Sequence, residues 1–585
     1  MKRIIILLSL LTYCQLAWSQ GFLRTERTNI INDEGNVLLR SIGTGNWMIQ
    51  EGYMMQSTGA NINTHTQFRE KLEEQIGKRK TAKFYDAWLE NHFTKADLDS
   101  MKAWGFNSVR VALHYKWFTL PIEEEKEVKG TLTNTWLDKG FAMTDQLLEW
   151  CEANEMYLIL DMHGAPGGQG KDANISDYDT DKPSLWESKE NQDKLTALWI
   201  KLADRYKDNI WIGGYDLINE PNWGFNGSGS ANGCGCSEND QIWDLHERLI
   251  QAIRTVDQNH IVYVSGNCWG NTYAGFENHS LKDVDDNMVI TFHKYWNYNS
   301  DVSVQGWLEM REKFQLPLWM SEAGENSNTW FSDCIALFEF NNIGWSWWPV
   351  KKSRVNNILK VDTPQSYKDL LAAWEKGEDL SKKETYNAVM EYMESHKNEN
   401  CIVAPDVIYA MMGQSTTNLT SPYTSHKINT PILFADYDMG RNRYAYFDHV
   451  SADYHVDTHK ERAVWNSGYS YRNDGVDIGI ENDATYVGWT EDGEWLKYTI
   501  QIASSGVYSI EVNYSAEEHD GALELTKNHI VLGEAILPKN GKPFDWRTVE
   551  MKNISLSEGN NELVFKIKKG GIHLKDFVIK KAKEL

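Results

Sequence analysis

Eight short apolar runs recur in the first 400 residues, and this repetition limits the possible folds more than any other feature of the chain. Longer amphipathic stretches separate the runs, among them residues 95–104, 138–154, 192–206, 240–256 and 304–314. Strand-like runs that alternate with helical patterns predict an α/β fold, a closed (β/α)8 TIM barrel with its sites at the carboxyl ends of the strands. The runs are residues 37–42, 108–113, 156–161, 212–218, 261–265, 288–292, 316–320 and 343–347.

An open, doubly wound sheet is the alternative for such an alternation. That fold normally carries a Gly-rich phosphate-binding turn after an early strand. The best match here, Gly43-Thr44-Gly45, is too short to count as that motif. The pattern therefore favours the closed barrel.

The pattern changes after residue 400, where a segment rich in Ser, Thr, Asn and Pro indicates a domain boundary. Short alternating strands follow and predict an all-β antiparallel sandwich, similar to a jelly roll. We predict a catalytic barrel at residues 20–410, a linker at 411–430 and a β-sandwich at 431–585. The expected sandwich strands are residues 495–500, 506–514, 522–525, 548–550, 562–567 and 573–579.

The first 19 residues are typical of a secretory signal peptide. Lys2-Arg3 precedes an apolar run at residues 4–11, and Ala17-Trp18-Ser19 offers small residues before a cleavage site. A membrane anchor needs about 18 apolar residues, and Tyr13-Cys14-Gln15 interrupts the run. No later stretch is long and apolar enough to cross a bilayer. The sequence therefore predicts a secreted protein without a membrane span.

The charge balance limits the partners. Asp and Glu number 83 against 59 Lys and Arg, a formal net charge of -24. A surface this acidic repels phosphate backbones, so we predict no nucleic-acid partner, and a neutral substrate fits better. The oligomeric state stays open.

Six cysteines remain after the predicted cleavage, and six allow fifteen connectivities. Two arrangements stay open: a disulfide that braces the Gly/Asn/Ser-rich loop at residues 222–240, or free buried thiols. The Cys234-x-Cys236 pair lacks a second pair at zinc-ligand spacing, so we predict no metal site there.

Polar or aromatic residues stand at the ends of several runs, where a barrel places its catalytic groups. Two are carboxylates, Glu220 after the fourth run and Glu322 after the seventh. Glycoside hydrolysis needs one carboxyl that keeps its proton and one that stays ionised. Arg110 and Tyr295 near Glu322 would hold it as the anion, and Glu220 beside that charge would keep its proton longer.

On these motifs the chain resembles glycoside hydrolase family 5. The resemblance implies retention of configuration, with Glu220 as acid/base and Glu322 as nucleophile, and no cofactor in the barrel. It also implies substrate-binding roles for Arg110, His163, Asn219, His293, Tyr295 and Trp348, with Trp347 as the alternative floor of the cleavage subsite. The matching stretches are GFNSVR (105–110), LDMHGAPGGQ (160–169), LINEP (217–221), HKY (293–295), WMSE (319–322) and GWSWW (344–348).

Within that family, the stretch at residues 160–169 looks most like the branch of exo-acting β-1,3-glucanases. A retaining enzyme that cleaves a neutral β-glucan is therefore expected. The long segment at residues 47–92 favours exo action if it walls off a pocket, but it fits one side of an open cleft equally well. The alternatives are an endo-β-1,4-glucanase, a mannanase, a transglycosylase, which uses the same carboxylates, and a non-catalytic polysaccharide-binding protein.

The last 150 residues resemble carbohydrate-binding module family 6. The resemblance implies that Tyr471 and Trp546 sandwich a sugar ring, with His573 or Lys575 where the family usually has Asn, and that Trp489 and Trp495 belong to the core. A structural calcium ion stays open, because Leu433-Phe434-Ala435 stands where glutamates are expected. The matching stretches are GYSYRNDGVDI (468–478), VGWTEDGEWLKY (487–498), GVY (506–508), Trp546 and GGIHL (570–574).

Overall fold

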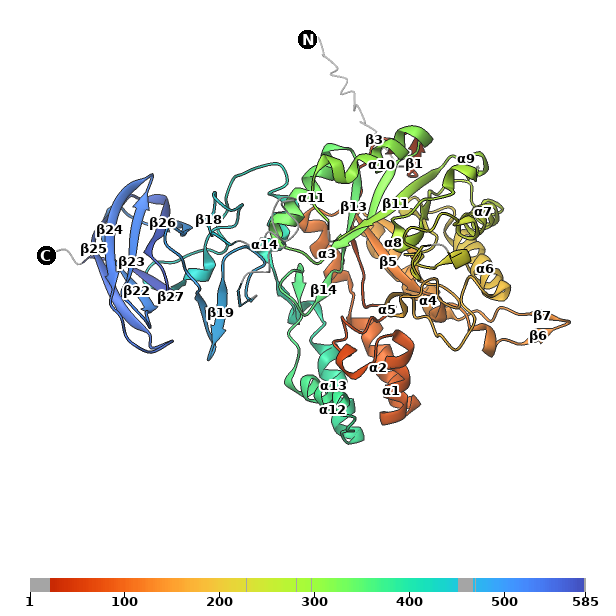
Figure 1. Ribbon diagram of the computed structural model, residues 1–585, viewed down its shortest axis with the longest axis horizontal. Coiled ribbons are helices and arrows are strands. Elements are labelled where there is room, and N and C mark those ends of the chain that lie inside the picture. The colour runs from red at the N-terminus through yellow and green to blue at the C-terminus, as the bar shows by residue number, and fades with distance from the viewer. Residues whose placement is uncertain are drawn as a thin grey trace, which may run out of the picture.

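The computed structural model describes residues 21–227, 229–279, 281–295, 297–450, 467–468 and 470–582. The predicted signal peptide lies outside these residues. Figure 1 shows a barrel with surrounding helices at one end of the molecule and a β-sandwich at the other, with α14 (Pro405–Met412) between them. None of the helices in the described ranges has the length and apolar character needed to cross a membrane.

Eight parallel strands close into a barrel, which confirms the predicted fold. Each predicted run contributes one strand. The third, sixth and seventh strands run further than expected, through His163, His293 and Glu322, whereas the fourth ends at Asp216, before Glu220. In chain order the strands are β4 (Arg40–Gly43), β5 (Ser108–His114), β8 (Tyr157–Gly164), β9 (Ile212–Asp216), β10 (Val262–Ser265), β11 (Met288–Lys294), β12 (Leu318–Gly324) and β13 (Gly344–Trp348).

The strands are buried on both faces because helices cover the outside and side chains fill the inside. All residues of β5, β8, β11 and β12 are buried, as expected for parallel strands. The amino-terminal end of the barrel is plugged by an apolar cluster that includes Leu23 and Ile30 from the first hairpin. That hairpin belongs to a small sheet of β1 (Arg24–Glu26), β2 (Asn29–Asn32) and β3 (Gly35–Asn36).

Six long helices connect the strands, and the predicted ones are all present. Local signals set their ends: the Thr94 and Asp97 side chains form a capping box at the start of one helix, and Gly105, with φ of 105°, ends it. The helices are α3 (Lys95–Trp104), α4 (Asp138–Ala153), α6 (Lys189–Tyr206), α7 (Asp240–Arg254), α10 (Asp301–Phe314) and α11 (Asn328–Phe340).

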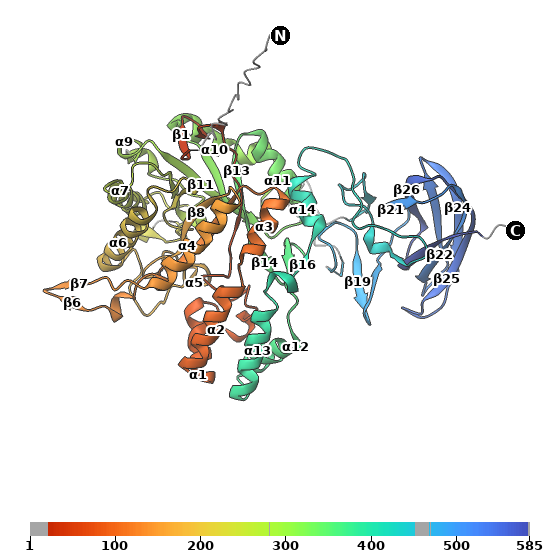
Figure 2. The same cartoon turned by 180° about the vertical axis from the view of Figure 1, so that it is seen from behind.

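Four further helices pack together beside the barrel (Figure 2). Two come from the long segment after β4, and two follow β13, so segments distant in sequence lie side by side. These helices are α1 (His65–Ile76), α2 (Lys78–Asn91), α12 (Gln365–Glu375) and α13 (Lys382–Glu394). The shorter elements around the barrel are α5 (Ala173–Ser176), α8 (Asn267–Gly270), α9 (Leu281–Val284), β6 (Glu127–Val128), β7 (Thr131–Leu132), β14 (Lys351–Lys352), β15 (Leu359–Lys360) and β16 (Ile402–Val403).

The carboxyl-terminal module is an antiparallel sandwich, as predicted. One sheet has the order β19-β20-β27-β22-β25 with β17 beside β27, the other β18-β21-β26-β23-β24, and one apolar core lies between them. The strands are β17 (Ile432–Leu433), β18 (Tyr446–Phe447), β19 (Ile478–Glu481), β20 (Ala484–Val487), β21 (Trp495–Ile502), β22 (Gly506–Ser515), β23 (Gly521–Lys527), β24 (Ile530–Leu537), β25 (Arg547–Leu556), β26 (Gly559–Lys569) and β27 (His573–Lys581).

Candidate active site

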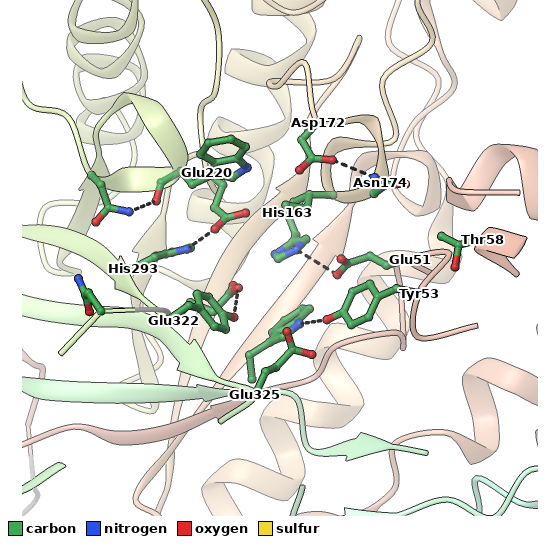
Figure 3. Close-up of a pocket in the computed structure, with 16 residues that line it drawn as sticks. Glu51, Tyr53, Thr58, His163, Asp172, Asn174, Glu220, His293, Glu322 and Glu325 are labelled. Carbon is green, nitrogen blue, oxygen red and sulfur yellow. Dashed lines mark hydrogen bonds and ion pairs between the residues drawn. The ribbon is translucent and has the colours of Figure 1, made fainter. Parts of the chain in front are cut away.

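A cavity of about 670 Å³ opens at the carboxyl ends of the barrel strands (Figure 3). It contains most of the residues expected from the sequence, and the loops after β4, β8, β10 and β12 complete its wall. The lining residues are Glu51, Tyr53, Thr58, His163, Asp172, Asn174, Ile175, Glu220, Trp269, Asn271, His293, Tyr295, Asn297, Glu322, Glu325 and Trp348.

Glu220 and Glu322 face each other across this cavity, as predicted. A carboxylate oxygen of each, together with a ring nitrogen of His293, lies within 4.8 Å of the others. The strand register shifts between Phe292 and His293, where β11 pairs with β12. Such irregularities re-aim side chains at strand ends. The short separation matches the roughly 5 Å that a covalent, retaining displacement requires.

Glu322 is held as the anion. Arg110 donates to its Oε2 at 2.8 Å, and the Tyr295 hydroxyl donates to its Oε1 at 2.7 Å. Burial alone would raise the pKa of Glu322, but interactions with His293 and Arg110 outweigh burial and lower it. Burial also raises the pKa of Tyr295 well above its ordinary value, so this hydroxyl keeps the proton that it donates.

The pKa of Glu220 is shifted in the opposite direction, upwards. Burial raises its pKa, the negative charge of Glu322 adds to this rise, and His293, whose Nδ1 lies 2.6 Å from Glu220 Oε1, opposes it. The backbone of Glu220 has φ of 47°, a left-handed conformation that residues with side chains rarely adopt. Asn222 supports it by donating from Nδ2 to the Glu220 carbonyl at 2.9 Å. The two carboxyls therefore have pKa values shifted in opposite directions.

Arg110 organises the floor of the site. Its Nε donates to Asp216 at 2.9 Å, and its Nη2 donates to Asn219 Oδ1 at 2.7 Å and contacts Asp161 at 3.1 Å. Asn219 is thus oriented by the same guanidinium that binds Glu322. The sequence did not predict roles for Asp161 and Asp216, although Asp161 lies within β8 and Asp216 is the last residue of β9.

His163 and Trp348 stack face to face, with ring centroids 4.8 Å apart and planes within 7°. Asp161 accepts from His163 Nδ1 at 2.8 Å and, although burial opposes this, raises the pKa of His163 to about 10. The structure decides between the two tryptophans: Trp348 lines the cavity. Trp347, the alternative, is wrong because its ring packs in the core against Phe331, 5.1 Å between centroids.

Glu51 and Tyr53 form the wall opposite Glu220 and Glu322, and the sequence did not single them out (Figure 3). Tyr53 accepts from Trp348 Nε1 at 3.2 Å. Glu51 Oε1 lies 3.8 Å from His163 Nε2, too far for a hydrogen bond, and burial raises the pKa of Glu51 to about 7. Both residues lie in a loop well beyond the end of β4, so no strand-end pattern marks them.

Trp269 lines the cavity together with Glu220. Its backbone N–H donates to the Pro221 carbonyl at 3.1 Å, and its φ of 54° lies in the left-handed region. The preceding residue, Cys268, forms a disulfide with Cys234. The structure therefore shows a disulfide that braces the loop at residues 222–240, and it also shows buried cysteines outside any disulfide, such as Cys151 and Cys334. Trp269 follows the fifth strand, so the strand-end rule applied to β10 would have found it.

The same carboxylates meet the geometric requirement for a metal site. In the described part of the chain, Glu220, His293 and Glu322 are the group of three potential ligands close enough to share one ion. The hydrogen bond between His293 and Glu220 already uses two of these ligand atoms. The contacts therefore fit a hydrogen-bonded group of two carboxyls and a histidine.

The module contains a group of neighbouring aromatic rings, from the buried Tyr486 to the exposed Trp489, here called the aromatic cluster: Tyr486, Trp489, Phe544, Trp546 and His573. Tyr486 contacts Trp489 at 6.2 Å and Trp546 at 6.1 Å between centroids, and Phe544 stacks on His573 at 4.9 Å. Trp489 is 50% exposed, so its predicted core position is wrong. Trp489 lies two residues after the end of β20, in the loop between two strands of the module.

Tyr471 does not join this cluster, so the predicted Tyr471–Trp546 sandwich is wrong. Its hydroxyl donates to Asp436 at 2.5 Å, its ring lies against Tyr423 with centroids 5.8 Å apart, and it packs on the module core. Trp546 and His573, by contrast, lie together as expected. Lys575 Nζ is 5.7 Å from the Trp546 ring.

Comparison with known proteins matches both parts of the chain. The family model described as cellulase (glycosyl hydrolase family 5) matches residues 59–354, slightly more than half of the 585 residues. The model of carbohydrate binding module family 6 matches residues 462–581. These matches agree with the two resemblances seen in the motifs.

Three relatives illustrate the range of similar proteins. A β-xylosidase of Phanerodontia chrysosporium is 32% identical over 44% of this chain and 48% of its own length. Endoglucanase C of Acetivibrio thermocellus is 25% identical over 46% of this chain and 88% of its own. A probable glucan 1,3-β-glucosidase A of Aspergillus niger is 26% identical over 38% and 50%, respectively. The chain thus spans about half the length of the first and third.

Proposed function

The chain belongs to glycosyl hydrolase family 5, and on this premise we propose that it is a secreted, retaining β-glycosidase that acts on a neutral β-glucan. One observation carries the proposal: Glu220 and Glu322 lie within 4.8 Å with pKa values raised and lowered, respectively. A double displacement needs this combination of separation and protonation states.

In the first step, Glu322 attacks the anomeric carbon as the bond to the leaving oxygen breaks. Glu220 gives its proton to that oxygen, so the leaving group departs as a neutral alcohol. A covalent glycosyl ester on Glu322 results. Arg110 and Tyr295, which hold Glu322 before the attack, keep its carboxylate aimed at the reacting carbon.

In the second step, water attacks the same carbon and Glu220 takes the proton of that water. Formation of the ester has removed the negative charge of Glu322, which was one cause of the raised pKa of Glu220. The pKa of Glu220 therefore falls between the steps, and the residue changes from acid to base. Release of the sugar restores both carboxyls.

The shape of the cavity favours action at a chain end. The loop with Glu51, Tyr53 and Thr58 stands opposite the catalytic pair, and a volume of about 670 Å³ lies in the range of small-ligand pockets. Glu51 Oε1 is buried without a hydrogen-bond partner, so it can accept a bond from a sugar hydroxyl. We propose exo action on β-1,3-glucan.

A second candidate is a β-xylosidase, favoured by the relative of that name at 32% identity. A time course of products from laminarin, cellulose, mixed-linkage glucan, mannan and xylan separates the candidates. Glucose as the sole early product from laminarin is expected. A ladder of oligosaccharides contradicts exo action, and xylose released from xylan supports the second candidate. Nuclear magnetic resonance of the first-formed anomer tests retention.

We further propose that the aromatic cluster binds polysaccharide, because the exposed Trp489 ring and the partly exposed Trp546 ring offer stacking surfaces for sugars. Trp489→Ala and Trp546→Ala are each expected to weaken retention on the insoluble polysaccharide about tenfold or more. Binding isotherms of the full-length variants measure this. Tyr444→Ala removes an exposed ring outside the cluster and serves as the matched control. If all three variants are retained as strongly as the wild type, the polysaccharide binds to another surface of the module.

A further inference from the structure

A buried polar interface joins the module to the loop after the nucleophile strand. The loop is short, because β12 ends at Gly324 and α11 begins at Asn328. Asn473 of the module donates from Nδ2 to the Asn326 carbonyl and to Asn328 Oδ1, at 2.9 Å each. The Asn328 N–H donates back to the Asn473 carbonyl at 3.2 Å. One module residue thus spans the connection between β12 and α11.

The groups around Asn473 fix its position. Asp406 of α14 accepts from the Asn473 N–H and from Asn328 Nδ2, both at 2.9 Å, so a third segment joins the contact. Asn473 is 1% exposed, and Asn326 is completely buried. Removing the hydrogen-bond partner of a buried polar group destabilises the folded protein, because no water molecule replaces the lost hydrogen bond. The interface is therefore a rigid support rather than a loose surface contact.

Contacts lead from this interface to the nucleophile. Asn326 Nδ2 lies 3.5 Å from the Tyr295 carbonyl oxygen, and the Tyr295 hydroxyl bonds to Glu322. Glu325, which lines the cavity, has φ of 54°, and such a conformation persists only where the surroundings enforce it. The loop therefore depends on contacts from outside the barrel strand, and Asn473 supplies three hydrogen bonds to Asn326 and Asn328, two of them from its side chain.

We propose that Asn473 is a positioning residue for the reaction: from the module side, it holds the loop between β12 and α11 and so keeps Glu322 and Tyr295 aligned. This inference rests on the proposed glycosidase function. It gives the module a second role, because support of the loop affects every substrate, including those too small to reach the aromatic cluster. Small displacements of a catalytic group lower the rate of the chemical step while binding persists.

The test compares full-length Asn473→Ala with the wild type on an aryl β-glycoside of the sugar found in the product analysis. We expect kcat to fall about ten- to a hundredfold, with KM changed by less than about twofold. Covalent trapping by the matching 2-deoxy-2-fluoro glycoside is expected to slow by the same factor. Asn560→Ala, at an exposed asparagine of β26, is the control and is expected to retain both rates.

Polysaccharide retention and the thermal unfolding midpoint of the same proteins show whether each variant is folded. If Asn473→Ala does not fold, Asn473→Leu replaces it, since leucine has a similar shape, fills the space and lacks the amide donor. Unchanged kcat and trapping rate in a folded variant overturn the inference. A wild type that neither turns over nor becomes trapped contradicts the proposed function instead, so the two failures are distinguishable.

Discussion

Glu322→Ala is expected to lower kcat by at least about 10⁴-fold on every substrate, because the variant lacks the carboxylate that forms the covalent intermediate. The change also leaves Arg110 and Tyr295 without the oxygen atoms to which they donate. Turnover of an aryl β-glycoside measures the loss. Added azide, a small anion that fits the vacated space, is expected to restore part of the rate and to give a glycosyl azide of inverted configuration.

The module provides the internal control for this variant. Its aromatic cluster lies in the sandwich, so retention on polysaccharide is expected to equal that of the wild type. A variant that binds polysaccharide but does not hydrolyse it has lost the chemistry and not the fold. Normal turnover by Glu322→Ala refutes the assignment of the nucleophile.

Glu220→Ala is expected to affect substrates according to their leaving groups. For a disaccharide, whose leaving oxygen needs a proton, kcat/KM is expected to fall about 10²- to 10⁴-fold. For an aryl glycoside with an acidic phenol, the first step needs little protonation, so kcat/KM is expected to change far less. Parallel assays of the two substrates measure the difference. An equal loss on both indicates that Glu220 acts by holding the site together rather than as the acid.

The pH profile gives an independent check. The active form carries protonated Glu220 and ionised Glu322, so kcat/KM of the wild type is expected to fall as the pH drops through the lowered pKa of Glu322. It is also expected to fall as the pH rises through the raised pKa of Glu220. In Glu220→Ala, the alkaline fall is expected to disappear for the aryl substrate. If kcat/KM of Glu220→Ala still falls at alkaline pH, a group other than Glu220 causes the fall.

The barrel and its catalytic pair were predictable because their signals are local. Parallel strands buried on both faces read as continuous apolar runs, and all eight runs became strands. The carboxyl ends of such strands meet at one face, which brought Glu220 and Glu322 together although about 100 residues separate them. The sandwich was equally predictable from the alternation of apolar and polar residues in its strands.

The errors arose where the local pattern allows two outcomes. In the doubled tryptophan at the end of β13, neighbouring side chains point to opposite faces, and only the packing shows that Trp347 enters the core. Tyr471 and Trp489 are both aromatic residues near module loops. The prediction placed Tyr471 at the surface and Trp489 in the core, and the structure has the reverse, because exposure depends on how each loop folds over the sheet.

By itself, the sequence determined the two folds, the order of the domains and the meeting of Glu220 with Glu322, since these follow from periodicity and from residues at strand ends. Only the tertiary structure decided which loop residues complete the cavity, that Cys234 pairs with Cys268, and that Asn473 supports the nucleophile loop. Each of these joins segments distant in the chain. Such contacts depend on packing between elements, which no local pattern of residues encodes.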